Sequence, residues 1–267
     1  MRLDVYLVEN QHFSSREQAK FNISKGNVLV NGNIALKPSQ QIVQTDTVSL
    51  MHENAIPYVS RGGLKLEKAL SVFGINCSGL DVIDIGASTG GFTDCALQHG
   101  AARVCAVDVG TNQLAEMLRE NPKVTSMEGI SIKDIDRGKL SPNKFHLLVT
   151  DLSFISLTKV MAYFTDLLLP QGSVVALIKP QFEVGREQVS KGGIVRNAKA
   201  HKMGIENVVE AARQFGLHLK GLTWAPIHST SKNIEYLAHF VQTSCADTNI
   251  MHVVENAFAD RNTMQKL

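Results

Sequence analysis

The segment Val82-Ile-Asp-Ile-Gly-Ala-Ser-Thr-Gly-Gly-Phe-Thr93 constrains the fold more than any other part of the chain. An apolar strand runs into a loop of small residues and then into a helix, which is how a doubly wound α/β sheet begins. In such sheets ligands bind beyond the carboxyl ends of the strands, where glycines let the backbone approach the ligand closely. The sequence therefore predicts a ligand-binding domain of the α/β class.

Strands and helices alternate from this segment onwards, which is the pattern of a parallel doubly wound sheet. The predicted strands are Asp81–Ile85, Arg103–Val107, Leu147–Thr150, Ser173–Ile178 and Leu219–Trp224. The predicted helices are Thr93–His99, Leu114–Glu120, Leu157–Leu168, Ala200–Phe215 and Asn249–Phe258.

The N-terminal part of the chain has a different sequence pattern, that of a small α+β domain. Apolar residues at helical spacing predict helices over Leu3–Val8 and Arg16–Ser24. A strand over Val28–Val30 is followed by Asn31-Gly32, a strong hairpin signal, and Thr47–Leu50 forms a last strand. We expect a small domain over residues 1–57 and the α/β domain over residues 58–267.

The glycine loop favours S-adenosylmethionine (SAM) as the cofactor. Its glycines follow the spacing G-x-x-x-G-G, which differs from the G-x-G-x-x-G pattern of dinucleotide sites and lacks the Lys-Ser/Thr ending of a phosphate loop. An acid after the second strand can accept hydrogen bonds from a ribose diol, a feature that suits NAD as well as SAM. An NAD-dependent oxidoreductase is thus a weaker alternative. The expected cofactor residues are Asp84, Gly86, Ala87, Ser88, Thr89, Gly90, Gly91, Phe92, Thr93, Asp108, Val109 and Asp151.

Ionisable residues stand where a doubly wound sheet would gather them. Asp151 and Lys179 each end an apolar strand, Lys65 precedes the first strand, and Glu235 comes late in the chain. A charge beside an apolar strand is costly to bury without a partner, so acids and bases that meet there can satisfy one another. Taken singly, each residue is equally consistent with a structural ion pair.

Several longer motifs resemble the TlyA (hemolysin A) family of rRNA methyltransferases. They are Asp84-Ile-Gly-Ala-Ser-Thr-Gly-Gly-Phe-Thr-Asp94, Asp151-Leu-Ser-Phe-Ile-Ser156, Lys179-Pro-Gln-Phe-Glu183 and Gly192-Gly-Ile-Val-Arg196. Arg2-Leu-Asp4, Ser15-Arg16, Ala19-Lys20 and Val30-Asn-Gly32 resemble the S4 RNA-binding domain that precedes the catalytic domain in that family. The resemblance covers nearly the whole chain, to about Phe240.

The resemblance implies a Rossmann-like, FtsJ-type methyltransferase that uses SAM to methylate the 2′-oxygen of a cytidine in ribosomal RNA. The family's Lys-Asp-Lys-Glu tetrad falls on Lys65, Asp151, Lys179 and Glu235. The implied roles are Lys179 as the base, Asp151 and Glu235 as groups that tune and orient it, and Lys65 as the group that positions the ribose.

Ribosomal RNA or a ribosomal subunit is the partner that the resemblance implies. Charge alone supports RNA binding little, because the net charge is only +2. With the resemblance, basic residues become candidates for phosphate contacts. They are Arg2, Arg16, Lys20, Lys25 and Arg61.

Two alternatives from other classes are a non-catalytic protein that binds rRNA or ribosomes, and a hemolysin-like factor that acts on membranes. The chain contains neither an apolar run of the ~20 residues that cross a bilayer nor a signal peptide. Its four cysteines form no C-x-x-C pair and have no metal-ligand spacing with histidines, which predicts reduced thiols and no metal. We expect a cytoplasmic protein, and the sequence leaves its oligomeric state open.

Overall fold

Apolar side chains at helical and alternating spacing build the first unit, Met1–Gly63, of the computed structural model. The second unit is Leu64–Leu267, and the predicted boundary after residue 57 lies close to this division. The structure describes residues 1–10, 12–13, 15–24, 26–43, 45–50, 56–227 and 231–264.

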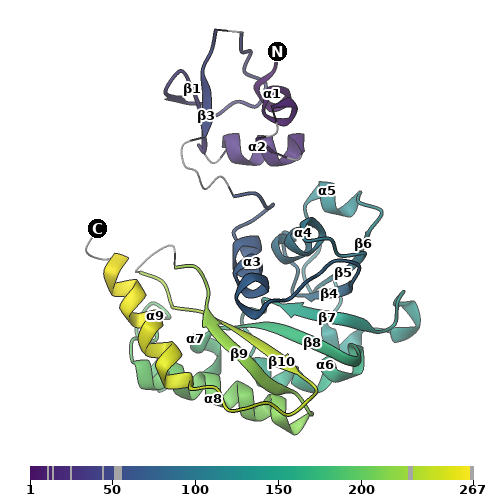
Figure 1. Cartoon of the computed structure of the whole chain (residues 1–267), viewed down its shortest axis with the longest axis vertical. Helices are drawn as coiled ribbons and strands as arrows, with labels where there is room; N and C mark the ends of the chain where they lie inside the picture. The colour runs from purple at the N-terminus through teal and green to yellow at the C-terminus, as the bar shows by residue number, and fades with distance from the viewer. Residues whose placement is uncertain are drawn as a thin grey trace. The chain divides into compact units, whose positions relative to one another are not determined.

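In the first unit two helices pack on a small antiparallel sheet of order β2-β1-β3 (Figure 1). Its elements are α1 (Leu3–Glu9), α2 (Arg16–Ser24), β1 (Val28–Val30), β2 (Asn33–Ile34) and β3 (Val48–Leu50). Asn31 and Gly32 have φ angles of 52° and 76° and join β1 to β2. This is the tight hairpin that the Asn-Gly pair predicts, because both positions of such a turn need positive φ. The predicted elements of this unit are confirmed.

The second unit is built on a seven-stranded sheet of order β6-β5-β4-β7-β8-β10-β9. The strands are β4 (Asp81–Ile85), β5 (Arg103–Asp108), β6 (Val124–Glu128), β7 (Phe145–Thr150), β8 (Leu168–Ile178), β9 (His218–Trp224) and β10 (Tyr236–Val241). All neighbouring pairs are parallel except those of β10, which is antiparallel to both β8 and β9. The sheet is therefore mixed, whereas the sequence pattern predicts a parallel one. The connection from β9 to β10 consists of residues 225–235, which is shorter than the dozen or more residues that a parallel crossover needs.

Helices cover both faces of this sheet (Figure 1). They are α3 (Gly62–Phe73), α4 (Gly91–Gln98), α5 (Glu116–Arg119), α6 (Met161–Leu167), α7 (Pro180–Glu183), α8 (Ala198–Gln214) and α9 (Ile250–Met264). Phe73 of α3 stacks on His239 of β10, with 5.5 Å between the ring centroids. None of the helices within the described ranges is long and apolar enough to span a membrane.

The five strands predicted for this unit are confirmed, but two helices are shorter than predicted. Only Glu116–Arg119 of the predicted Leu114–Glu120 is helical, and Leu157–Leu168 divides into a 3-10 turn and α6. The sequence analysis does not predict α3, α7, β6 or β10.

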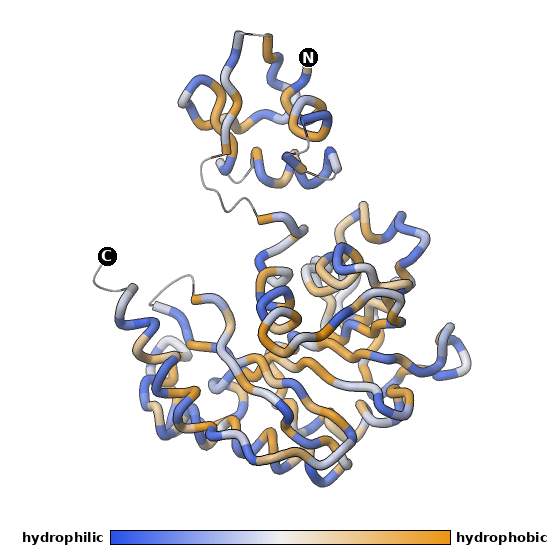
Figure 2. Tube along the Cα trace, in the orientation of Figure 1, coloured by the Kyte–Doolittle hydropathy of each residue, from blue (hydrophilic) through white to orange (hydrophobic). Residues whose placement is uncertain are grey.

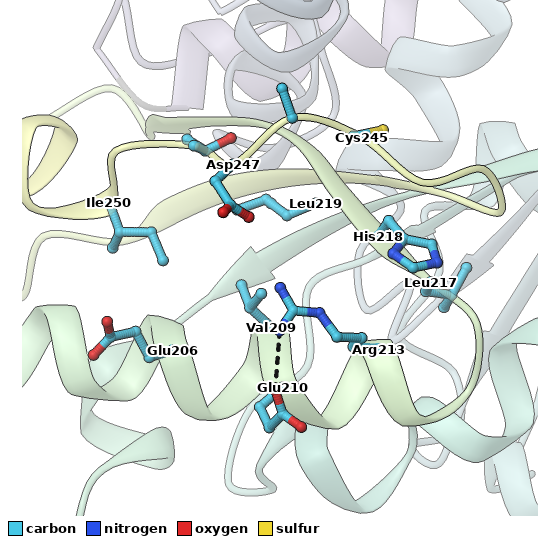
Figure 3. A pocket seen from close by; sticks show the side chains of 12 residues that line it. Glu206, Val209, Glu210, Arg213, Leu217, His218, Leu219, Cys245, Asp247 and Ile250 are labelled. Carbon is cyan, nitrogen blue, oxygen red and sulfur yellow. Dashed lines mark hydrogen bonds and ion pairs between the residues drawn. The ribbon is translucent and has the colours of Figure 1, made fainter.

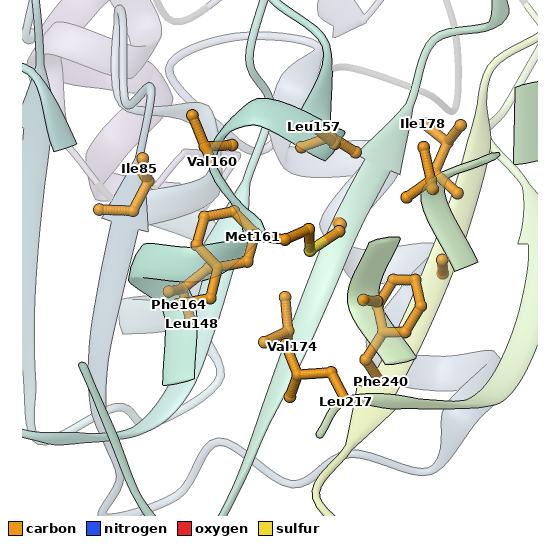
Figure 4. Packing of buried hydrophobic residues seen from close by; sticks show 14 of the residues in the cluster. Ile85, Leu148, Leu157, Val160, Met161, Phe164, Val174, Ile178, Leu217 and Phe240 are labelled. Atoms are coloured by element: carbon orange, nitrogen blue, oxygen red, sulfur yellow. The ribbon is translucent and has the colours of Figure 1, made fainter. Parts of the chain in front are cut away.

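Apolar residues follow the strands at the centre of the larger sheet (Figure 2). Figure 4 shows Phe164 and Met161 of α6 packed among residues of the central strands, such as Leu148 and Val174. All four side chains are fully buried. Burial of this kind contributes about 1.5–3 kcal/mol of folding free energy for each large apolar side chain. The core therefore stabilises the packing of α6 against the central strands.

His201 of α8 is a buried polar residue that ties three segments together. Its Nε2 lies 2.9 Å from the carbonyl oxygen of Val195, which only accepts, so Nε2 carries the proton. Nδ1 then accepts from the hydroxyl of Tyr236 in β10, at 2.9 Å. Burial lowers the pKa of His201 to about 4, and Arg261 adds to the effect. The neutral ring is therefore the form that the fold requires.

We predict that His201 makes the stability of the second unit depend on pH. A histidine whose pKa is lower in the folded state contributes stability above the unfolded value of 6.5 and loses it as the pH falls toward 4. Wild type and H201Q would be unfolded in urea at several pH values and followed by the fluorescence of Trp224, the only tryptophan. The free energy of unfolding that separates them should shrink by up to about 3 kcal/mol between pH 7 and pH 4. A difference in the free energy of unfolding between wild type and H201Q that does not change with pH would contradict the prediction. The exposed His252→Gln variant is the control, and its difference from wild type should stay constant.

Candidate active site

Four charged residues meet at one edge of the larger sheet. Lys65 of α3 places its Nζ 2.8 Å from Oε2 of Glu235 and 3.3 Å from Oδ2 of Asp151. Lys179 places its Nζ 2.6 Å from Oδ1 of the same Asp151. The structure thus brings together all four residues that the sequence analysis proposes as a catalytic group.

Sheet topology explains why residues so far apart in sequence meet. β7 and β8 are adjacent and parallel, so Asp151 and Lys179, which directly follow them, lie at the same edge. β10 runs the other way, and its first residue, Tyr236, pairs with Ile178. Glu235 therefore lies beside Lys179 although the two residues are 56 positions apart in the chain.

The four groups form a cluster that is balanced in charge and mostly buried. The side chain of Lys179 is 9% exposed, and those of Lys65, Asp151 and Glu235 are 18–23% exposed. Burial lowers the pKa of Lys65, but Asp151 and Glu235 outweigh it, so the net shift is upward. Burial raises the pKa of Asp151, but the two lysines outweigh it, so the net shift is downward. Lys65 is consequently held as a cation and Asp151 as an anion.

Two residues of the loop after β7, Ser153 and Phe154, and Phe182 of α7 complete this edge, although the sequence analysis assigns them no role. Ser153 accepts a hydrogen bond from Nζ of Lys179, at 2.7 Å. Phe154 is 92% exposed with a φ of 64°, and its ring lies 5.5 Å from that of Phe182. An exposed aromatic ring beside the charged cluster can stack on a planar base. Exposure of an apolar residue is a property of the folded loop, and the sequence carries no signal for it.

Glu183 holds the same loop in place from the side of β8. Its Oε1 accepts from the backbone N–H of Leu157 at 2.9 Å, and its Oε2 accepts from the hydroxyl of Ser156 at 2.5 Å. Burial raises the pKa of Glu183, and these two hydrogen bonds oppose the rise. The position of the residues that follow Asp151 is therefore set by a buried side chain from α7.

The glycine loop between β4 and α4 lies directly against the loop of Asp151. Gly86 has a φ of 85°, and a Cβ there would lie 3.0 Å from a methyl carbon of Leu152 and 3.3 Å from the carbonyl oxygen of Asp151. Gly90 has a φ of 94°. Glycine is required at both positions because other residues rarely adopt such angles. The predicted cofactor loop and the charged cluster thus share one edge of the sheet.

Asp84, at the end of β4, has a carboxylate with an unmet interaction. Its Oδ2 accepts from the hydroxyl of Thr93 at 2.7 Å, whereas its buried Oδ1 has no hydrogen-bond partner among the described residues. Burial, with a smaller contribution from nearby Asp151, raises the pKa of Asp84 to about 7. A cationic ligand at this edge would stabilise the ionised carboxylate.

The remaining predicted cofactor residues divide by exposure. Gly90, Gly91, Phe92 and Thr93 are buried, as is Ala87, while Ser88, Thr89 and Val109 are exposed. Asp108 accepts from the backbone N–H of Ser88 at 2.8 Å and from that of Gly110 at 2.7 Å. Its carboxylate thereby connects the glycine loop to the end of β5, and each oxygen keeps a lone pair for a ligand hydroxyl.

Two predicted RNA-binding arginines of the first unit share one buried acid. Arg2 donates to Asp4 through Nε at 2.9 Å, and Arg16 does so through Nη2 at 2.8 Å. Asp4 is fully buried, and hydrogen bonds from the two arginines lower its pKa to about 2. Lys20 lies 3.6 Å from the carboxylate of Glu17. Arg61 is exposed, and Lys25 lies outside the described residues.

A cavity of about 360 Å³ lies between α8, β9 and the segment that precedes α9 (Figure 3). His218, the first residue of β9, and Arg213 of α8 contribute to its wall. β9 begins at the edge of the sheet opposite the charged cluster, so this cavity does not belong to the candidate active site. Within the described ranges no group of three or more His, Cys, Asp or Glu residues could hold a metal ion.

Two family models match the chain. The FtsJ-like methyltransferase model matches residues 58–242, and the S4 domain model matches residues 1–48. The first covers the whole charged cluster and the glycine loop, and the second covers α1, α2, β1 and β2 of the first unit and ends at the first residue of β3.

Known proteins resemble the chain over most of its length. Hemolysin A of Brachyspira hyodysenteriae is 42% identical over 90% of this chain and 100% of its own. The 16S/23S rRNA (cytidine-2′-O)-methyltransferase TlyA of Mycobacterium tuberculosis is 37% identical over 88% of this chain and 87% of its own. A solved candidate hemolysin from Streptococcus thermophilus is 41% identical, with a TM-score of 0.78 over 100% of this chain and 98% of that one. The chain belongs to the FtsJ-like methyltransferase family, and within it to the S4-containing group of the TlyA and hemolysin A proteins.

Proposed function

We propose that this protein methylates the ribose 2′-oxygen of a cytidine in ribosomal RNA with SAM as the methyl donor. The observation that carries the proposal is the contact of Lys65, Asp151, Lys179 and Glu235 beside a glycine loop. Such a cluster offers acid–base groups where a cofactor would lie. The name of the relative from Mycobacterium tuberculosis supports cytidine and rRNA as the target.

The cofactor edge suits a cationic donor. Asp84 offers a buried oxygen that has no hydrogen-bond partner among the described residues, and Gly86 at the start of the loop has a φ of 85°, which glycine tolerates. Asp108 stands where it can accept hydrogen bonds from a ribose diol. When bound, SAM supplies an electrophilic methyl group on a positively charged sulfur. No residue here requires a metal for this chemistry.

Lys179 is the residue best placed to remove the proton of the 2′-hydroxyl. Lys65 is held as a cation by two carboxylates, so it can neutralise charge but is a poor proton acceptor. Lys179 contacts one carboxylate and the hydroxyl of Ser153. Once its own proton has left to solvent, its amine would take the proton of the ribose hydroxyl. SAM, when bound, would supply the methyl group to that oxygen, and its bond between the methyl carbon and sulfur would break to leave a neutral thioether. Asp151 then stabilises the ammonium that results.

We predict that K179A lowers the rate of methyl transfer about 10²- to 10⁴-fold, because it removes the proposed general base. Methyl transfer from labelled SAM to ribosomal subunits from cells lacking the protein would be measured at saturating SAM. Calorimetry should give a SAM affinity close to that of wild type. Lys159, which is exposed and follows the same loop, provides the control K159A, which should keep the wild-type rate. A K179A enzyme with a normal rate would refute the assignment.

We predict that Asp84 makes SAM binding depend on pH. The carboxylate with a pKa of about 7 attracts a cationic ligand only when ionised, so affinity should rise through pH 7 and level off above it. The D84N variant should bind more weakly at pH 8 and approach wild type at pH 5.5. Calorimetry would measure the SAM affinity of both proteins. The protonation of SAM itself affects both proteins equally, so the difference between them reports on Asp84. Equal ratios of the two affinities at pH 5.5 and pH 8 would exclude this role.

The first unit has its own apolar core and two exposed arginine side chains, as expected of a module that docks to phosphates. We predict that deletion of residues 1–57 weakens binding to rRNA at least tenfold while SAM affinity stays the same. Filter binding of rRNA and calorimetry with SAM would measure the two affinities. The deletion leaves the larger core unchanged, and circular dichroism would verify its folding. Unchanged RNA affinity in a folded truncated protein would show that the module does not bind the substrate.

A further inference from the structure

The motif Gly192-Gly-Ile-Val-Arg196 forms a tight turn that the proposed chemistry does not use. Ser190 closes the turn, because both its backbone N–H and its hydroxyl donate to the carbonyl oxygen of Ile194, at 2.9 and 2.6 Å. Gly192 and Gly193 at its tip have φ angles of 94° and 80°, and a Cβ on either would meet no atom within 4 Å. The tip is thus open to an approaching molecule.

Asn233 fastens this turn to the candidate active site. Its Oδ1 accepts from the backbone N–H of Val195, and its Nδ2 donates to the carbonyl oxygen of Gly193, both at 2.8 Å. His201 adds a third tie, to the carbonyl oxygen of Val195. Asn233 precedes Glu235 by only two residues, so its amide connects the turn directly to the segment that carries a member of the charged cluster.

The segment around the turn is exposed and positively charged. Residues 186–199 contain four cationic side chains and one carboxylate, and all four cations are exposed. They are Arg186, Lys191, Arg196 and Lys199. Within the part of the chain that the structure describes, none of them forms an ion pair, whereas the cations of the candidate active site are paired. Free cations beside exposed glycines suit the oxygens of a phosphodiester.

We propose that the Ser190–Arg196 turn binds the phosphate backbone of the RNA next to the methylated nucleotide. Asn233 is the positioning residue that holds this turn at a fixed position relative to Lys179. This inference rests on the proposed function, since it names the part of the catalytic unit that takes the substrate. Lys191 and Arg196 supply the charge. The glycines let the RNA backbone approach, and Asn233 keeps the turn at a fixed place beside Glu235.

The test compares two variants with a matched control. K191Q/R196Q removes two charges from the turn, and N233A removes both hydrogen bonds without changing any charge. K123Q/K144Q removes two exposed charges that precede β6 and β7, at the opposite edge of the sheet. Binding to rRNA would be measured by filter binding at roughly evenly spaced salt concentrations between about 50 and 300 mM. Calorimetry would give the SAM affinity, and steady-state kinetics would give the rate of methylation.

K191Q/R196Q should bind rRNA roughly tenfold more weakly at low salt, and the slope of log K against log salt should fall by about 1.5, because two phosphate contacts are lost. N233A should lower the same slope by about one and raise the KM for RNA. A purely structural role would not change the slope, because this variant loses no charge. The control variant and the SAM affinities should match wild type.

Three outcomes would overturn the proposal. One is a K191Q/R196Q protein whose salt slope matches that of K123Q/K144Q. Another is an N233A protein with an unchanged slope and a lower kcat at saturating RNA, which would mean that Asn233 acts only on Glu235. If N233A does not fold, a wild-type slope in K191Q/R196Q alone decides against the turn. Failure of the proposed function is separate, because wild-type protein would then transfer no methyl group while RNA binding could still be measured.

Discussion

A single carboxylate shared by two ammonium groups is the interaction on which the candidate active site depends. Asp151 contacts Lys65 through one oxygen and Lys179 through the other, and Lys65 contacts Glu235 in turn. Removing one member of a buried ion pair costs about 3–5 kcal/mol, because the other charge is left without compensation. The four groups therefore hold one another in place, and with them the ends of β7 and β8 and the beginnings of α3 and β10.

Two acids at neighbouring strand ends, Asp151 and Asp84, have pKa values that are shifted in opposite directions. Asp151 already has two cations, and its pKa is lowered. Asp84 is fully buried, one of its oxygens lacks a partner among the described residues, and its pKa is raised to about 7. The edge of the sheet thus combines a cluster whose charges are satisfied with a carboxylate that a cation would satisfy. This contrast fits the proposed sulfonium donor, because that donor would bring a positive charge to the carboxylate of Asp84, which has none beside it among the described residues.

Much of the larger unit could be predicted because its signals are local. The strand Asp81–Ile85 is buried as its Val and Ile residues predict, and Gly86 and Gly90 adopt the positive φ angles that glycine tolerates. The sequence analysis does not predict β10, and it expects a parallel sheet. β10 runs antiparallel to β9 because the connection between them, residues 225–235, is too short for a parallel crossover, and periodicity does not encode strand direction. The sequence does not predict helix α3, because its first turn contains two glycines, which disfavour helix.

The sequence by itself determined which residue types stand at the ends of the strands, where the backbone needs glycine, and which family the motifs resemble. Tertiary structure alone decided which of those residues meet. Lys65 and Asp151 lie 86 positions apart, Ser153 contacts Lys179 from the loop after β7, and Asn233 accepts from the backbone N–H of Val195, 38 positions away. The reason is physical: burial, ion pairing and hydrogen bonding act over a few ångströms in space, and only the packing of the sheet and its helices brings such distant positions within that range.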